Sequence, residues 1–134
     1  AAALDPACDL ARSHGCVVAV SGPVDLVTDG ESVVHIQGGS ALLTRMTGGG
    51  CALGAVVAAF LGVGRKEGLD DVSTVVAAHA VYSAAAERAE SRSTGPGSFS
   101  PAFLDALYAL EVQDLQNVSV SATGATTAAQ GVPA

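Results

Sequence analysis

The segment TGGGCALGAVVAAF, at residues 47–60, places three consecutive glycines and a cysteine directly before a run of small apolar residues. A glycine-rich turn that leads into a helix presents unpaired backbone N–H groups at the positive end of the helix dipole, where an anion is stabilised. Gly48, Gly49 and Gly50 allow the backbone to approach a phosphate closely and to adopt positive φ. Cys51 would then lie in the first helical turn, where a thiolate is favoured. The pattern predicts an anion hole at these three glycines, beside a thiol that can act as a base or a nucleophile.

Two familiar phosphate-binding motifs do not fit this segment. A Walker loop requires a lysine after the glycines, and none follows here. Gly48 and Gly50 with Gly54 fall one residue outside the GxGxxG spacing of dinucleotide-binding proteins. Composition alone is also compatible with a packing turn in which Cys51 is a small buried hydrophobe.

The composition predicts helices packed closely on a sheet. Hydrophobic residues make up 49% of the 134 residues, but only 4% are aromatic and there is no tryptophan. Ala, Val and Leu must therefore form the core, with Gly allowing elements to approach each other. A chain of this length corresponds to one domain, and we expect the α/β class.

The charge pattern argues against nucleic acid as a partner. The net charge is −7, and the six basic residues are scattered without interleaved aromatic residues. An anionic ligand would have to be bound locally, by backbone N–H groups or by a metal. The apolar run at residues 51–63 is too short and too rich in glycine for a membrane span, so we predict a buried helix and no membrane partner.

The cysteines and histidines indicate neither a disulfide framework nor a metal site. Cys8, Cys16 and Cys51 include no CxxC pair, and the three histidines lack ligand spacing. Asp5 and Asp9 interrupt the apolar start, so no secretory leader is expected. These features predict a reducing, cytoplasmic setting.

Capping and turn residues predict the order of the elements. Asp5-Pro6 is typical of a helix start and Gly15 of its end. Asp29-Gly30 predicts the turn of a tight hairpin. Asp70-Asp71 opens a long helix, and Ser100-Pro101 is expected to cap the last one. The predicted elements are a helix at 5–14, a strand covered on both faces at 16–21, a hairpin within 25–39, a short strand at 41–47, and helices at 51–61, 70–92 and 102–110.

This order amounts to half of a layered α/β domain, because too few strands are present to cover three consecutive helices. We therefore expect either a fragment or a unit that packs against something else. Residues 1–112 would form this partial domain. Residues 113–134 are rich in Ser, Thr, Ala, Gly and Gln and are predicted to be a flexible tail outside the fold.

Three segments that occur in order resemble the C-terminal half of the hydroxyethylthiazole kinase family, within the ribokinase-like superfamily. They read CVVAVSGPVDLVTDGESVVHIQGG, LLTRMTGGGCALGAVVAAF and GPGSFSPAFLDALYAL. The resemblance covers Leu4 to about Leu110 and implies a partial ribokinase-like layered fold. It also implies ATP with Mg²⁺, phosphorylation of 4-methyl-5-(2-hydroxyethyl)thiazole in thiamine biosynthesis and salvage, and a cytoplasmic homotrimer with active sites at subunit interfaces.

The resemblance also implies roles for individual residues. Cys51 stands near the acceptor hydroxyl, where most ribokinase-like relatives have an aspartate base. Gly50 would lend its backbone N–H to the transferring phosphate, and Gly48 would contact the substrate. Ser21 falls where the family usually has a threonine that contacts ATP. Gly49 departs from the family pattern Gly-Thr-Gly-Cys.

The resemblance leaves a second hypothesis open. The N-terminal half of the family fold is missing, including the segment that organises Mg²⁺ and phosphate. The chain alone could therefore be a catalytically silent ribokinase-like fragment, or a binding or assembly module.

Several other polar residues are expected to have ordinary roles. Asp25 and Asp29 are interpreted as solvated turn formers, and Arg45 as an exposed arginine at a strand end. Glu87 and Arg88 would lie on a solvated helix face. The remaining candidates, His35 and His79, are expected to be structural or surface residues, and Tyr82 to belong to the core.

Overall fold

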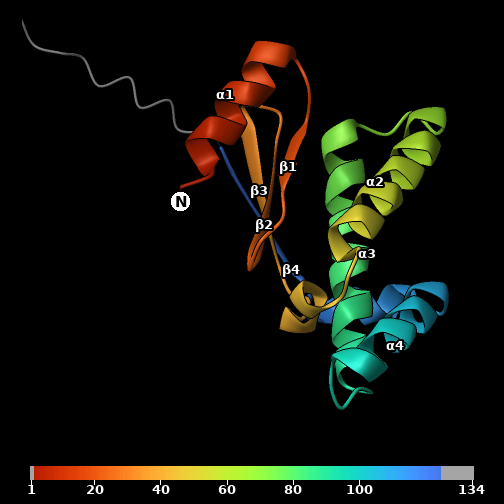
Figure 1. The fold of residues 1–134 in the computed structure, drawn as a ribbon. Coiled ribbons are helices and arrows are strands. Elements are labelled where there is room, and N and C mark those ends of the chain that lie inside the picture. The colour runs from red at the N-terminus through yellow and green to blue at the C-terminus, as the bar shows by residue number, and fades with distance from the viewer. Residues whose placement is uncertain (1, 125–134) are drawn as a thin grey trace, which may run out of the picture.

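The computed structural model of the protein describes residues 2–124, which form a four-stranded antiparallel sheet packed by helices. The strand order is β1-β2-β3-β4, and the sheet lies beside a group of three longer helices (Figure 1). This arrangement confirms the α/β class. In chain order the elements are α1 (Leu4–His14), β1 (Val18–Val20), β2 (Val24–Thr28), β3 (Ser32–Gln37), the 3₁₀-helix η1 (Ala41–Arg45), α2 (Gly49–Lys66), α3 (Asp71–Glu90), α4 (Pro96–Tyr108), the 3₁₀-helix η2 (Val112–Asn117) and β4 (Ser119–Gly124).

Alternating side chains of the sheet pack against helices on its two faces. Leu26 and Val33 pack with buried residues of α1. Val27 and Val34 belong to a separate buried cluster that includes Val75 of α3. Because neighbouring residues of a strand point to opposite faces, one pair of strands contributes to both clusters.

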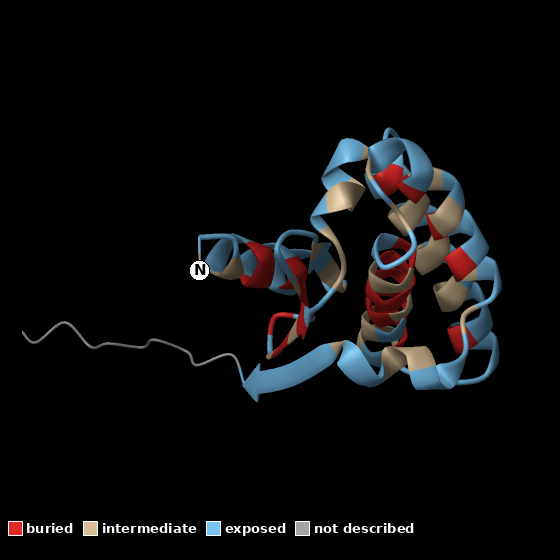
Figure 2. Cartoon of the chain, turned by 90° about the horizontal axis from the view of Figure 1, so that it is seen from below, coloured by how far each residue is buried: buried red, intermediate tan, exposed pale blue. Residues whose placement is uncertain are grey.

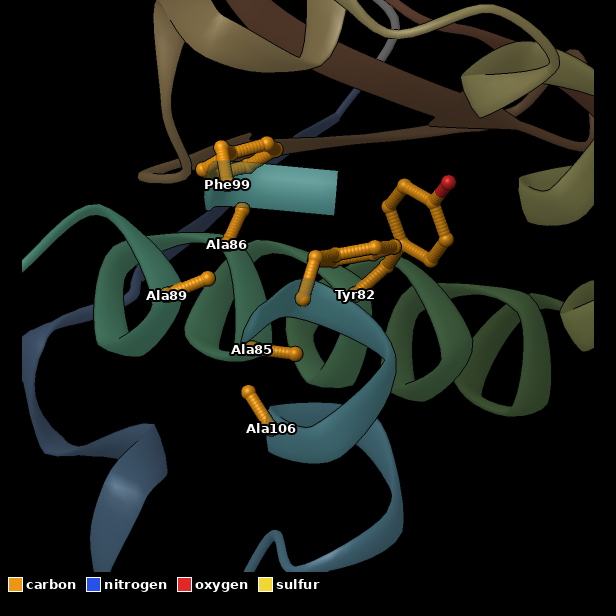
Figure 3. Close-up of a cluster of buried hydrophobic side chains, with 7 residues drawn as sticks. Tyr82, Ala85, Ala86, Ala89, Phe99 and Ala106 are labelled. Carbon is orange, nitrogen blue, oxygen red and sulfur yellow. The ribbon is translucent and has the colours of Figure 1, made fainter. Parts of the chain in front are cut away.

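The third buried cluster joins α3 to α4 and contains the largest buried side chains. Phe99 and Phe103 of α4 are fully buried, and their rings stack with centroids 5.8 Å apart. They pack over a run of alanines on α3, which lets the two helices approach each other (Figure 3). Figure 2 shows that α3 is the most deeply buried helix of the chain.

The predicted hairpin is confirmed, and the local sequence explains it. A turn of three residues, 29–31, joins β2 to β3. The Asp29 carboxylate accepts the N–H of Ser32 at 2.7 Å and the N–H of Glu31 at 2.9 Å. These hydrogen bonds, chiefly the one from Ser32, hold the pKa of Asp29 below its ordinary value. Gly30 adopts φ +95°, and a Cβ there would lie 2.5 Å from the side chain of Arg12.

The predicted start of α3 at Asp70-Asp71 is confirmed, but its predicted end at Arg92 is not. Asp70 caps the helix by accepting the N–H of Ser73 at 2.8 Å, which lowers the pKa of Asp70. The helix ends at Glu90, two residues before the predicted Arg92.

Gly15 ends α1 with φ 59°, as expected, but α1 begins at Leu4 without the predicted cap by Asp5.

Two predicted strands differ from the structure. The strand expected at 16–21 is reduced to Val18–Val20, which lies at the edge of the described sheet with Ala19 exposed. The strand expected at 41–47 is the 3₁₀-helix η1 instead. Ser40 caps η1, because its hydroxyl oxygen accepts the N–H of Leu42 at 3.1 Å and draws the chain into a turn.

Helix α2 differs most from its prediction. It begins at Gly49 and continues through Gly62 and Gly64 to Lys66, although both glycines were expected to end it. A Cβ at Gly64 would lie 2.6 Å from the Thr74 hydroxyl, so this glycine is a packing contact with α3 and not a helix stop. The helix is not buried within the described residues: of its own residues only Gly49 and Gly64 are buried. By length and composition alone α2 would suffice to cross a membrane, with a hydropathy of 1.2.

The C-terminal segment also corrects the sequence prediction. Helix α4 begins at Pro96, at the N-terminal position that proline favours, so Ser100 lies inside the helix and does not cap it. Residues 113–124 are not a tail: η2 follows α4, and β4 pairs with β3 from Ser119 opposite Gln37 to Gly124 opposite Ser32. The rest of the predicted tail, 125–134, lies outside the described residues.

Replacing Thr28 by Val should lower the free energy of unfolding by about 1–3 kcal/mol. Thr28 is fully buried, and its hydroxyl donates to the Ser32 carbonyl at 2.6 Å and accepts the Gly30 N–H at 2.9 Å. Valine would leave these two buried groups without a partner. Urea unfolding followed by circular dichroism measures the effect.

Thr44→Val is the matched control, because the Thr44 hydroxyl bonds the Ala41 carbonyl at an exposed site. Its unfolding free energy should change by less than about 0.5 kcal/mol. Equal unfolding midpoints for the two variants would contradict the importance of the Thr28 hydrogen bonds.

Candidate active site

The glycine loop, residues 47–51, begins α2 in an open arrangement. Gly48 is the N-cap, with φ 84° in the left-handed region that favours glycine. Gly49 and Gly50 are the first two helical residues, and Cys51 is the third. The helix therefore begins two residues earlier than predicted, and the glycines form its first turn and not a separate loop before it.

Two backbone N–H groups of the glycine loop have no acceptor among the residues that the structure describes. The Gly49 N–H donates to the Met46 carbonyl at 3.5 Å, and the Ala52 N–H donates to the Gly48 carbonyl at 2.8 Å. The N–H groups of Gly50 and Cys51 make no such bond within residues 2–124. Both residues are exposed, and a Cβ built at Gly50 would meet nothing within 4 Å. This end of α2 has the donors and the space that an anion requires.

Cys51 is exposed and free, as is Cys16, whereas Cys8 is buried. Within residues 2–124, Cys51 is therefore not a buried hydrophobe. Cys51 follows Gly50 in the chain, so the thiol and the unpaired Gly50 N–H belong to neighbouring residues. Unpaired N–H groups at a helix start suit an anion, and a cysteine accepts a proton only as its thiolate.

Tyr82 of α3 contacts the glycine loop through its hydroxyl group. Its hydroxyl donates a hydrogen bond of 2.5 Å to the Gly49 carbonyl oxygen. Burial of the side chain raises the pKa of Tyr82, so the phenol remains protonated as a donor at neutral pH. Gly49 itself is buried, and a Cβ there would lie 3.1 Å from the Leu43 carbonyl oxygen. The sequence placed Tyr82 in the core correctly, but no spacing signal connects its hydroxyl to a loop 33 positions away.

Ser21 lies on a different segment, the turn between β1 and β2, and its side chain is exposed. Figure 1 shows this turn and the start of α2 toward the same end of the sheet. No hydrogen bond joins Ser21 to the glycine loop within the described part of the chain. The structure thus brings Gly48, Gly49, Gly50 and Cys51 into one turn, and Ser21 lies on another segment without a hydrogen bond to them.

A buried pair that the sequence did not reveal fixes the Ser21 turn. One Asp25 carboxylate oxygen accepts the Gly22 N–H at 2.8 Å, and the other lies 2.7 Å from Nδ1 of His79 on α3. His79 is 2% exposed. The expectation that Asp25 is a solvated turn former is therefore wrong. The two side chains are 54 positions apart, and nothing in the local sequence predicts their contact.

Two more side chains of α3, which were expected to lie on a solvated helix face, bind other segments of the chain. A Glu87 carboxylate oxygen accepts the Gly39 N–H at 2.9 Å, and Arg88 pairs with Asp114 of η2 at 2.8 Å. Arg45 is exposed at the end of η1, three residues before Gly48, and no ion pair is formed by it within residues 2–124.

The described residues contain no group of three or more His, Cys, Asp or Glu side chains that could bind a metal ion. A cavity of about 500 Å³ lies between the C-terminal part of α2 and the start of α3, lined by apolar residues that include Phe60, Val63 and Leu69. It includes no residue of the glycine loop.

An α/β fold with unpaired amides at a glycine-rich helix start is suited to binding an anion such as a phosphate group. Residues 1–113 match the hydroxyethylthiazole kinase family. The chain therefore belongs to the hydroxyethylthiazole kinase family, as the resemblance implied.

Individual relatives agree with this assignment. The chain is 53% identical over 115 residues to the hydroxyethylthiazole kinase of Serratia proteamaculans, covering 86% of this chain and 42% of the relative. It is 52% identical over 110 residues to the enzyme of the same name from Tolumonas auensis, covering 81% and 40%. The solved structure of hydroxyethylthiazole kinase from Pyrococcus horikoshii OT3 matches with a TM-score of 0.82 at 30% identity, covering 90% of this chain and 46% of that one. The chain spans less than half the length of these relatives.

Asp25→Ala should lower the free energy of unfolding by about 2–3 kcal/mol, because it leaves the buried His79 ring and the Gly22 N–H without their acceptor. Asp105→Ala is the matched control, since Asp105 is an exposed acid on α4, and it should change stability by less than about 0.5 kcal/mol. Thermal or urea unfolding measures both. Equal stabilities would show that the Asp25–His79 pair does not fix the turn.

The stability of the protein should fall at alkaline pH partly through Tyr82. Burial raises the folded-state pKa of Tyr82, so the folded state retains the proton more strongly than the unfolded chain does. This contribution is complete below the ordinary tyrosine pKa of about 10 and is lost as the pH rises toward the higher folded value.

We expect wild-type protein to lose more unfolding free energy than Tyr82→Phe between about pH 9 and about pH 11. Tyr108→Phe provides the control, because Tyr108 is 94% exposed, and it should follow the wild type. If the unfolding free energies of wild type and Tyr82→Phe changed with pH in parallel, Tyr82 would not be a source of the alkaline loss of stability.

Proposed function

We propose that this chain supplies the C-terminal half of an enzyme that transfers the γ-phosphoryl group of ATP to the hydroxyethyl group of 4-methyl-5-(2-hydroxyethyl)thiazole. One observation carries the proposal beyond family membership: the N–H groups of Gly50 and Cys51 lack acceptors among residues 2–124, at the exposed start of α2 and beside a free thiol. The names of the relatives support the same reaction.

Phosphoryl transfer requires an aligned acceptor hydroxyl and neutralisation of the charge that develops on the moving group, with little covalent work by the protein. The unpaired Gly50 N–H and the positive end of the α2 dipole supply fixed donors for that charge. Gly48 would contact the thiazole alcohol and Ser21 the ATP. The Cys51 thiolate would receive the hydroxyl proton, and in a loose transition state this transfer comes late, so a strong base is not required.

Mg²⁺ would neutralise the ATP phosphates when bound, and residues 2–124 contain no group of three or more His, Cys, Asp or Glu side chains that could bind a metal ion. We propose that its ligands lie mainly in the part of the family fold outside this chain. The exposed apolar side of α2 and the outer edge of β1 are surfaces that the rest of the enzyme would cover. By family resemblance we propose a cytoplasmic homotrimer with active sites between subunits.

A second candidate function is that of a module without catalysis. The glycine loop lies outside the cavity described above. On its own the chain would then be a catalytically silent module that binds or assembles. The experiment below separates the two functions by testing the chain alone and joined to the missing half.

The test uses a chimera in which the N-terminal half of the Serratia proteamaculans relative precedes Ala1, and compares it with the 134-residue chain. We expect the chimera to release ADP from Mg-ATP in a thiazole-dependent manner and the chain alone to release none. Absence of thiazole-dependent ADP release from a folded chimera, with the parent Serratia enzyme active under the same conditions, would remove the proposed reaction.

In the chimera, Cys51→Ser should reduce kcat by less than about a hundredfold, because late proton transfer demands little basicity. Cys51→Asp should preserve or raise kcat, since aspartate is the base of most ribokinase-like relatives. Cys51→Ala tests complete removal of the group. Cys16→Ser is the control for the other exposed thiol and should leave kcat unchanged. Equal kcat values for all Cys51 variants and the wild type would exclude a proton-transfer role for Cys51.

A further inference from the structure

The hydrogen bond from Tyr82 acts on the same peptide unit that carries the Gly50 donor. The Tyr82 hydroxyl lies 2.5 Å from the Gly49 carbonyl oxygen. This C=O and the Gly50 N–H belong to one peptide group, which is planar and trans, since no cis peptide bond occurs in the described chain. In a trans peptide the C=O and the N–H point in opposite directions. Whatever fixes the direction of the Gly49 carbonyl therefore fixes the direction of the Gly50 N–H.

Within the glycine loop this peptide unit is restrained only by the first turn of α2, which begins at Gly49. Neither Gly49 nor Gly50 has a Cβ, and glycine backbones rotate more freely than any other. Gly48, Gly49 and Gly50 have no side chain that could limit that rotation. A side chain at position 49 would also be crowded, because its Cβ would lie 3.1 Å from the Leu43 carbonyl oxygen.

Tyr82 is itself held rigidly, which makes it an effective anchor. The residue is 4% exposed, and its ring packs edge-on against Phe103 with centroids 4.8 Å apart and an interplanar angle of 73°. Figure 3 shows the ring inside the cluster formed by α3 and α4, with the hydroxyl pointing away from the labelled alanines. The position of the donor is thus set by the α3–α4 core.

We propose that Tyr82 is a positioning residue of the anion hole: its hydroxyl aims the Gly50 N–H at the transferring phosphoryl group. The inference rests on the proposed function. The same hydrogen bond strengthens the donor, because a carbonyl that accepts a hydrogen bond polarises its own N–H. Tyr82 acts through Gly50 and does not itself contact a reacting atom.

The test compares Tyr82→Phe with Tyr108→Phe in the chimera described above. Phenylalanine retains the ring that packs on Phe103 and removes only the hydroxyl. We expect Tyr82→Phe to lower kcat by roughly tenfold or more and to change the KM values for ATP and thiazole by less than about threefold, because an aimed donor matters most in the transition state. Tyr108→Phe should match the wild type, since Tyr108 is exposed. Assays are run well below the melting temperature of each variant.

A second measurement reports on the peptide unit directly. With ¹⁵N-glycine labelling of the same proteins, the Gly50 amide nitrogen should shift in Tyr82→Phe, because it is bonded to the carbonyl that loses its donor. The resonances of Gly62 and Gly95, distant along the chain, serve as internal references. Rotation of the freed peptide should also broaden the Gly50 signal.

The outcomes separate the inference from the proposed function. Loss of kcat together with a Gly50 shift supports the inference. Unchanged kcat, an unmoved Gly50 resonance, or a fall in activity that matches only the loss of folded protein would overturn it. A wild-type chimera without turnover would refute the proposed function instead, and the Gly50 resonance would then still decide whether Tyr82 holds this peptide unit.

Discussion

Polar side chains of the buried helix α3 hold separate segments of the chain in place. His79 binds the β1–β2 turn through Asp25, Tyr82 binds the glycine loop, and Glu87 binds the Gly39 backbone. Arg88 adds the connection to η2. Because these partners reach α3 from distant parts of the sequence, the geometry of the candidate site depends on how α3 is packed. The alanines of α3 matter for the same reason, since they allow α4 and the sheet to enclose the helix.

The features that the sequence predicted well are those decided by neighbouring residues. The β2–β3 hairpin follows from Asp29 and its hydrogen bonds to residues two and three positions later. The start of α3 follows from Asp70, and the end of α1 from Gly15. The glycines at the start of α2 were also visible in the sequence, although composition alone was compatible with a packing turn as well.

The features that were missed depend on contacts between distant residues. Gly62 and Gly64 resemble helix stops, but α3 lies close enough to stabilise an uninterrupted α2. The tail composition suggested disorder, yet the open edge of β3 offers hydrogen bonds that recruit residues 119–124 as β4. In the site, Asp25 with His79 and Tyr82 with Gly49 are each separated by more than thirty positions. No local pattern reports such pairs.

The close contact between Gly64 and Thr74 has a mechanical consequence for the glycine loop. Fifteen residues of helix separate Gly64 from Gly49, a distance of about 22 Å along the axis. A rotation of about 10° at this crossing would displace the far end of α2 by roughly 4 Å. A methyl group at position 64 would thus push α2 away from Thr74 and displace the backbone amides of the glycine loop, although it does not contact them.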